Sequence, residues 1–208
     1  MNRIFILSPA YCGGKRSQLL SRPEAEFDLA QRLRSEDGVK LGELFSFLSG
    51  LYFRGKLAYS QAFARPPMGV PGAVIITPSR GLMMPADLVD LDRLQEFAAV
   101  EIGLSEERFR EPLIETARLL ADQLSNECEV VLLGSIATGK YLDLLAAIFS
   151  ERMRFPVEFA GRGDMSRGGL LLRCVTEQCE LEYVSLSQGA RHGSRPPKLS
   201  RVRRTEIF

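Results

Sequence analysis

Short apolar runs alternate with longer amphipathic stretches along the chain. The apolar runs have the length and β-branched content of buried strands and are followed by Gly, Pro or charged loops; they lie at residues 4–7, 73–77, 129–133 and 156–160. Apolar residues recur at helical spacing at residues 23–35, 42–64, 87–101 and 105–124, and a further helix is expected to follow residues 134–140 and to end at residue 149. Because parallel strands need a crossover that a helix supplies, this alternation predicts an α/β fold. We expect a three-layer sandwich with a mostly parallel central sheet of about four strands flanked by helices.

Glycine and proline inside the helical stretches predict interruptions. Gly50 and Gly55 each cost about 1 kcal/mol relative to alanine in a helix, so the second stretch is expected to break near residues 51–55. Pro112 is expected to begin a new helix within the fourth stretch, because proline lacks the N–H that a helix interior uses. We therefore expect some of the helical stretches to be divided into two helices.

The apolar pattern fades toward the end of the chain. Residues 182–186 are predicted to be extended, and residues 170–175 fit either a helix or the first strand of a hairpin. From residue 187 the sequence is rich in Gly, Pro and Arg, which predicts one α/β domain over 1–186 and a basic tail over 187–208. Such a tail either binds nucleic acid through phosphate contacts or is a solvated terminus, and the sequence leaves both open.

The composition is that of an ordinary globular protein, with 45% hydrophobic and 25% charged residues. The net charge of +1 provides no general attraction for nucleic acid. No apolar run approaches the roughly 20 residues that cross a bilayer, so we expect a cytoplasmic protein without membrane contact. The sequence has four cysteines, Cys12, Cys128, Cys174 and Cys179, without a disulfide framework, which predicts reduced thiols. Cys174 and Cys179 are spaced C-x4-C, but a second pair that would complete a zinc site is missing. We expect no metal and no cofactor. The oligomeric state cannot be read from this pattern.

Each predicted strand leads into a loop rich in glycine or charge. Ligands of open α/β sheets bind outside the carboxyl ends of the strands, so these loops are expected to share one edge: residues 8–16, 77–81, 134–140 and 161–169. They hold several basic residues and a single acid, Asp164; the basic residues are Lys15, Arg16, Arg80, Lys140, Arg162 and Arg167. This edge is therefore expected to be positive and to bind an anion. The alternative is that the glycines only make tight turns and the basic side chains are solvated.

The candidate ligand-binding residues all come from these loops: Ser8, Cys12, Gly13, Gly14, Lys15, Arg16, Arg80, Gly134, Ser135, Lys140, Arg162 and Arg167. Gly13 and Gly14 would let backbone N–H groups approach a phosphate or carboxylate. Residues 134–140 match the G-x-x-x-x-G-K phosphate loop, but Tyr141 stands where Ser or Thr would bind Mg²⁺. This loop therefore predicts phosphate binding without NTP hydrolysis.

Two residues are candidates for chemistry. Asp164 is the candidate catalytic residue, because it is the single acid of the four loops and would orient a substrate or activate water. Pairing with the flanking Arg162 and Arg167 is the structural alternative. Cys12 would need a base to become a nucleophile, and the single histidine of the chain, His192, lies in the tail.

Four segments resemble the uracil-DNA-glycosylase-like α/β superfamily, closest to its small uncharacterised bacterial members. The segments span about residues 4–172 and read ILSPAYCGGKR, LYFRGKLAYSQAFAR, VIITPSRGLMMP and VVLLGSIATGKYLDLL. The resemblance implies the same fold and a base- or nucleotide-sized pocket. The catalytic signatures of classical members, an acidic or asparagine residue after the first strand and a late histidine loop, are not matched by SPAYCGGKR and GRGDMSRGG.

The sequence thus predicts a protein that binds an anionic nucleotide-like ligand or nucleic acid at the carboxyl edge of the sheet. Whether it acts on a nucleobase or N-glycosidic bond, as a hydrolase or transferase, stays open. The alternative is a noncatalytic nucleotide-sensing or nucleic-acid-binding module. A third hypothesis is a plain interaction protein that uses the aromatic helix around residues 45–63 as its partner surface.

Overall fold

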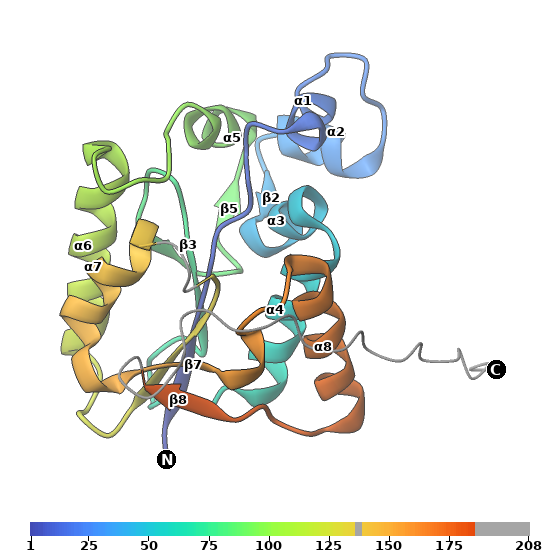
Figure 1. Cartoon of the computed structure of the whole chain (residues 1–208). Coiled ribbons are helices and arrows are strands. Elements are labelled where there is room, and N and C mark those ends of the chain that lie inside the picture. The colour runs from blue at the N-terminus through green and yellow to red at the C-terminus, as the bar shows by residue number, and fades with distance from the viewer. Residues whose placement is uncertain (136–138, 186–208) are drawn as a thin grey trace.

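The computed structural model describes residues 1–135 and 139–185 and contains a six-stranded mixed sheet (Figure 1). The strand order is β4-β3-β1-β6-β7-β8. The four inner strands are parallel: β1 (Arg3–Leu7), β3 (Ala73–Ile76), β6 (Glu129–Leu133) and β7 (Met153–Pro156). The two edge strands are antiparallel to their neighbours: β4 (Leu82–Met83) and β8 (Tyr183–Ser185). A separate antiparallel pair joins β2 (Val39–Lys40) to β5 (Leu88–Val89).

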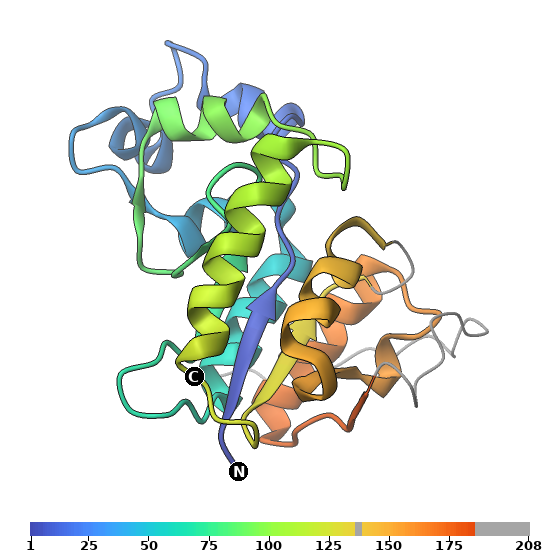
Figure 2. The same cartoon turned by 90° about the vertical axis from the view of Figure 1, so that its left-hand side faces the viewer.

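Helices cover both faces of the six-stranded sheet, as expected for a three-layer sandwich (Figures 1 and 2). One face carries α6 (Glu107–Asp122) and α7 (Gly139–Phe149). The other face carries the remaining helices: α1 (Lys15–Leu20), α2 (Asp28–Arg34), α3 (Leu41–Ser49), α4 (Leu51–Phe63), α5 (Leu91–Ala98) and α8 (Asp164–Glu177). Two short 3-10 turns flank β7, at Ser150–Arg152 and Val157–Phe159.

The central strand β1 is buried on both faces, which explains its continuous apolar sequence. Ile4 and Ile6 face the α6–α7 layer, whereas Phe5 and Leu7 face the layer that contains α4 and α8. The two hydrophobic clusters therefore lie on opposite sides of one sheet. No helix in the described part of the chain is both long enough and apolar enough to span a membrane.

The N-terminal helical prediction was wrong in its bounds. Instead of one helix over residues 23–35, the chain forms α1 directly after the glycine loop and α2 after a turn. The break in the second stretch falls at Gly50, whose φ of 65° lies in the left-handed region that glycine tolerates. Gly55 stays inside α4, because it packs against another helix.

Pro112 does not begin a helix, as had been predicted, but lies inside the continuous α6. Packing outweighs the lost hydrogen bond here, because Phe109 and Leu113 are fully buried on the same face. The predicted strand at 156–160 is shifted to β7, and residues 157–159 turn as a 3-10 helix. Residues 170–175 belong to α8 rather than to a hairpin.

Candidate functional site

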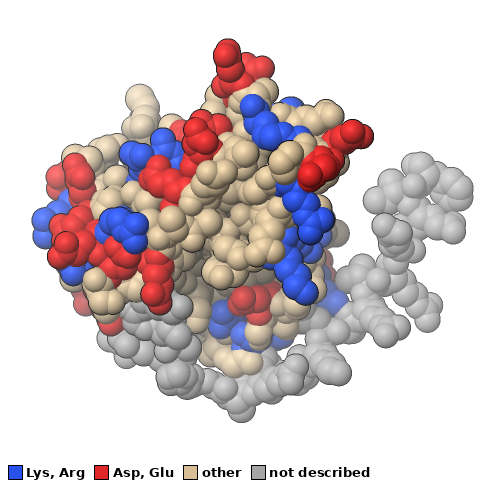
Figure 3. All heavy atoms as spheres, turned by 90° about the horizontal axis from the view of Figure 1, so that it is seen from above, with Lys and Arg blue, Asp and Glu red and all other residues tan. Residues whose placement is uncertain are grey.

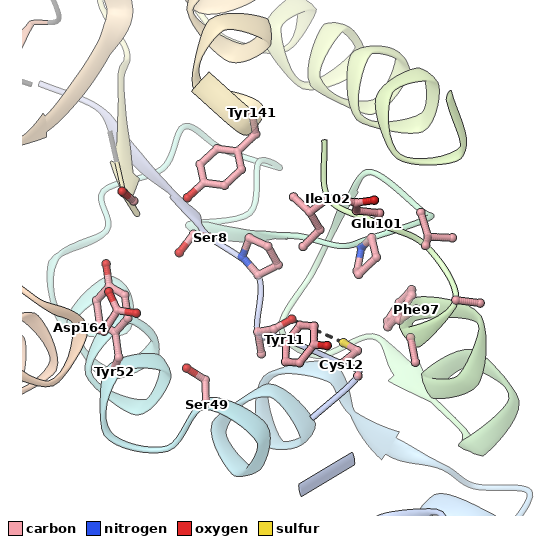
Figure 4. Close-up of a pocket in the computed structure, with 18 residues that line it drawn as sticks. Ser8, Tyr11, Cys12, Ser49, Tyr52, Phe97, Glu101, Ile102, Tyr141 and Asp164 are labelled. Atoms are coloured by element: carbon pink, nitrogen blue, oxygen red, sulfur yellow. Dashed lines mark hydrogen bonds between the residues drawn. The ribbon is translucent and has the colours of Figure 1, made fainter. Parts of the chain in front are cut away.

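A pocket of about 790 Å³ opens at the carboxyl ends of the parallel strands (Figure 4). Each of the four glycine-rich or charged loops contributes to its wall: Ser8 follows β1, Pro78 follows β3, Ser135 follows β6 and Asp164 follows β7. The expectation that these loops share one edge of the sheet is confirmed, because parallel strands place their carboxyl ends together.

The pocket wall combines aromatic rings, hydroxyl groups and carboxylates. The aromatic residues of the wall are Tyr11, Tyr52, Phe97 and Tyr141. The hydroxyl groups come from Ser8, Ser49 and Ser135, and the carboxylates from Glu101 and Asp164. Residues 97–102, at the end of α5 and beyond it, form a wall that the sequence did not indicate. Within the described residues, this lining contains no Lys or Arg.

A buried lysine lies behind the pocket wall. Lys56 is on α4 and only 1% exposed, and its Nζ atom lies 2.6 Å from the Ser8 carbonyl oxygen and 2.8 Å from Ser8 Oγ. The same Nζ atom lies 4.6 Å from the ring centroids of Tyr52 and Phe53. Ser8 itself is held by a backbone hydrogen bond from its N–H to the Leu133 carbonyl, 3.1 Å long. The lysine amine is therefore fixed against a serine that lines the pocket.

Burial lowers the pKa of Lys56 to about 7, because the charged amine loses its hydration. Two charges from α8 act in opposite directions: Asp164 raises this pKa and Arg167 lowers it. The Asp164 carboxylate is largely exposed and lies 3.6 Å from the Arg167 guanidinium. A substantial fraction of Lys56 is thus neutral near pH 7.

Gly134 brings the Tyr141 hydroxyl and Ser8 together. A Cβ atom at Gly134 would lie 2.8 Å from Ser8 Cβ and 2.9 Å from Tyr141 Oη, so both side chains pack directly over the glycine. Figure 4 shows the Ser8 side chain directed toward the Tyr141 hydroxyl. Burial raises the pKa of Tyr141, so its hydroxyl stays protonated. Tyr141, which stands where the phosphate-loop pattern requires Ser or Thr, therefore lines the pocket beside Ser8.

Two glycines let α8 approach α4 closely enough to complete the site. A Cβ atom at Gly55 would lie 2.7 Å from the Gly168 carbonyl oxygen, and one at Gly168 would lie 2.7 Å from Tyr52 Cα. The helices therefore touch backbone to backbone. This contact brings the start of α8, with Asp164, to the pocket and helps to bury Lys56.

The two arginines near Asp164 form hydrogen bonds within the protein. Arg167 is buried, and its Nη2 atom donates to the Phe159 carbonyl at 2.9 Å. Arg162 Nη1 lies 3.2 Å from Ser166 Oγ. The ion pair between Asp164 and Arg167 matches the structural alternative for this acid, although Asp164 also lines the pocket.

The other basic candidates lie outside the described pocket lining. Arg16 Nη1 donates to the Phe47 carbonyl at 2.7 Å, and Arg80 Nε pairs with Glu96 at 2.8 Å. Lys15 is exposed at the start of α1. The Lys140 side chain lies outside the described residues. The expected positive edge thus does not extend into the pocket wall, because arginines that looked free in the sequence have partners in the fold.

Cys12 and Gly13 line the pocket as predicted, while Gly14 precedes α1 as its N-cap. Burial raises the pKa of the Cys12 thiol to about 12, so a thiolate nucleophile is not favoured here. Gly134 supports the pocket from beneath Ser8. Of the loop candidates, Ser8, Cys12, Gly13 and Ser135 are thus placed at the pocket.

Sequence reasoning missed Lys56, although a signal was present. Lys56 is four residues after Tyr52 and three before Tyr59, on the aromatic face of α4 that packs into the core. A lysine on the apolar face of a helix is rarely buried without a purpose, because ionisation there is costly. The position of the residue, rather than any motif, could have identified it.

Comparison of the chain with models of known protein families, with curated proteins and with solved structures finds no match. The resemblance to the uracil-DNA-glycosylase-like superfamily therefore stays a prediction. Fold and site together define an α/β protein with one edge pocket built around a serine and a buried lysine.

Proposed function

We propose that this protein binds a nucleobase- or nucleoside-like ligand in the edge pocket and acts on it. The observation that carries the proposal is the convergence of four strand-end loops on one pocket lined by aromatic rings and hydroxyl groups. Its volume of about 790 Å³ falls within the range of small-molecule sites. The carboxyl edge of a parallel sheet is also where α/β proteins bind their ligands.

The chemistry of the wall favours a flat ligand with polar edges. The ring of Tyr11 is largely exposed at the pocket and can stack on a planar heterocycle, and every nucleobase has such a face. The carboxylates of Glu101 and Asp164 accept hydrogen bonds from exocyclic amines, while serine hydroxyls donate or accept. This combination suits a base better than a phosphate.

A phosphate on the ligand would have to lie outside the described pocket wall. Figure 3 looks onto this edge of the molecule and shows both Lys and Arg (blue) and Asp and Glu (red) side chains around a central surface of other residues (tan). Lys15 is the nearest exposed candidate along the chain, two residues after the pocket residue Gly13. An anionic, nucleotide-like ligand therefore fits with its base inside and its phosphate toward the first loop.

Binding of a small panel tests the proposal. The panel contains adenine, guanine, cytosine and uracil as free bases, nucleosides and monophosphates, with affinity measured by calorimetry and retained ligands identified by native mass spectrometry. Ala98→Trp should weaken binding at least tenfold, because Ala98 is exposed and lines the pocket. Gln95→Trp is the matched control, since Gln95 is exposed on the same helix outside the described lining. Absence of any binding tighter than about 1 mM would overturn the proposal.

A noncatalytic sensing module is the second candidate, favoured by one contact. Lys56 donates to the Ser8 carbonyl oxygen, which is a structural hydrogen bond that needs no reaction. In that case the lysine only holds the first loop in place. We propose the cytoplasm as the compartment, in keeping with four cysteines that are all unpaired.

A further inference from the structure

The two contacts of Lys56 with Ser8 put the amine within hydrogen-bond distance of the serine hydroxyl. A neutral amine has two N–H groups and one lone pair. Donation to the Ser8 carbonyl at 2.6 Å uses one N–H, and the lone pair can then accept the Ser8 hydroxyl proton across 2.8 Å. The contact with the carbonyl thus orients the amine toward Oγ of the same residue.

We propose that Ser8 and Lys56 are a serine–lysine catalytic pair in which Ser8 is the nucleophile and Lys56 its general base. The substrates are acyl compounds, esters or amides, whose carbonyl carbon is presented to Ser8 Oγ at the pocket wall. The inference rests on the proposed function only in using the same pocket, and it does not require a nucleobase in the substrate.

The reaction balances without a further reactant besides water. The Ser8 hydroxyl proton passes to Lys56 Nζ while Oγ bonds to the carbonyl carbon. Collapse of the tetrahedral adduct breaks the bond to the leaving group, which takes the proton from Lys56 and departs as an alcohol or amine. Water then attacks the acyl-serine and gives a proton to Lys56; on collapse Ser8 Oγ recovers that proton and the carboxylic acid is released.

The groups around Lys56 allow its amine to gain and lose a proton during the reaction. The rings of Tyr52 and Phe53 lie against Nζ and stabilise the transient ammonium by cation–π attraction. From α8, Asp164 favours and Arg167 opposes the charged form, so neither state of the amine is locked. From α7, the Tyr141 hydroxyl lies next to Ser8 as a protonated donor beside the attacking oxygen.

Gly134 and the β1–β6 ladder preorganise the nucleophile. The backbone hydrogen bond from Ser8 to Leu133 holds the main chain, and the space above Gly134 accommodates the serine side chain. Because Ser8 is only 6% exposed, its hydroxyl has little freedom to turn away from the amine. This rigidity is what a nucleophile–base pair needs.

Labelling with a fluorophosphonate tests the pair without a known substrate. The probe phosphonylates activated serines, and intact-mass and peptide analysis locate the adduct. We expect one adduct at Ser8 in the wild-type protein and none in Ser8→Ala. Lys56→Met should slow labelling at least about 100-fold, as expected for loss of a general base. Lys40→Met is the matched control, since Lys40 is exposed, and it should label at the wild-type rate.

The pH dependence of wild-type labelling covers the case in which Lys56→Met does not fold. The rate should rise with pH through about 7, as the amine loses its proton. Lys56→Arg should not restore labelling, because guanidinium does not deprotonate in this range. Hydrolysis of p-nitrophenyl acetate should be lost in Ser8→Ala.

Three results would overturn the inference: no adduct at Ser8 in folded wild-type protein, wild-type labelling of a folded Lys56→Met, or a rate that is flat between pH 6 and 9. Bound nucleosides together with an inert Ser8 would leave the proposed function standing and reject the pair. Labelled Ser8 together with no binding from the nucleobase panel would support the serine–lysine pair and reject the proposed function.

Discussion

Replacing Lys56 by methionine should change how the stability of this protein depends on pH. Burial lowers the pKa of Lys56 from 10.5 to about 7. At about 1.4 kcal/mol for each pKa unit, keeping the charged amine buried costs on the order of 5 kcal/mol at and below pH 7. Methionine removes this cost but also the hydrogen bonds to Ser8, which contribute about 1–3 kcal/mol. Lys56→Met should therefore be about 2–4 kcal/mol more stable than wild type at pH 6.

The difference should shrink as the pH rises. Above pH 7 the folded protein loses the Lys56 proton while the unfolded chain keeps it up to about 10.5, so the unfolded state binds more protons. The free energy of unfolding of the wild type should rise by about 1.4 kcal/mol per pH unit relative to the variant. Urea denaturation of wild type, Lys56→Met and the exposed-lysine control Lys40→Met at pH 6, 7, 8 and 9 measures this. Parallel pH curves for wild type and Lys56→Met would refute a buried, deprotonating lysine.

Three further results are expected. Gly168→Ala should lose about 2 kcal/mol or more of unfolding free energy in thermal or urea denaturation, because its Cβ would meet the facing helix backbone at 2.7 Å; Gly163→Ala, with nothing within 4 Å, should be nearly neutral. Gly134→Ala should reduce fluorophosphonate labelling at least tenfold by displacing the pocket serine, and labelling at the wild-type rate would contradict the packing described. Removal of residues 187–208, which lie outside the described residues, should weaken nucleic-acid binding and flatten its salt dependence if the basic tail contacts phosphates; unchanged binding across a salt series would exclude that role.

The first-loop lysine carries the remaining prediction. Lys15→Ala should weaken a monophosphate relative to the matching nucleoside while unfolding free energy changes by less than about 0.5 kcal/mol, because the side chain is exposed. Calorimetry with the nucleoside and the monophosphate, alongside urea denaturation, measures both effects. Equal losses for the two ligands would show that Lys15 does not meet the phosphate.

The parallel core of the sheet could be predicted because its signals are local. Runs such as residues 4–7 and 130–133 are apolar without interruption, as expected of strands buried on both faces. The edge strand β4 could not be predicted, since two residues have no periodicity. The prediction that a new helix begins at Pro112 was wrong for a related reason. The low helix propensity of proline predicted a boundary there, but burial of the neighbouring apolar residues outweighed that propensity.

The position of the site was predictable, but its chemistry was not. Ser8 and Ser135 were candidates because strand-end loops share one edge in any parallel sheet. The expected roles of Arg16, Arg80 and Arg167 depended on their being free, and only the fold revealed their partners. Charge along a sequence does not show which charges are already paired.

The sequence by itself determined the alternation of strands and helices, and with it the edge at which the loops meet. The hydrophobic periodicity that distinguishes a strand from a helix can be recognised within a few consecutive residues. The tertiary structure alone decided that Lys56 lies 2.8 Å from Ser8 Oγ, 48 positions earlier in the chain. That contact depends on Gly55 and Gly168, which let the backbones of α4 and α8 touch, and on Gly134, whose missing side chain leaves room for Ser8. Such contacts arise from packing between distant segments, and burial then lowers the pKa of Lys56 to about 7.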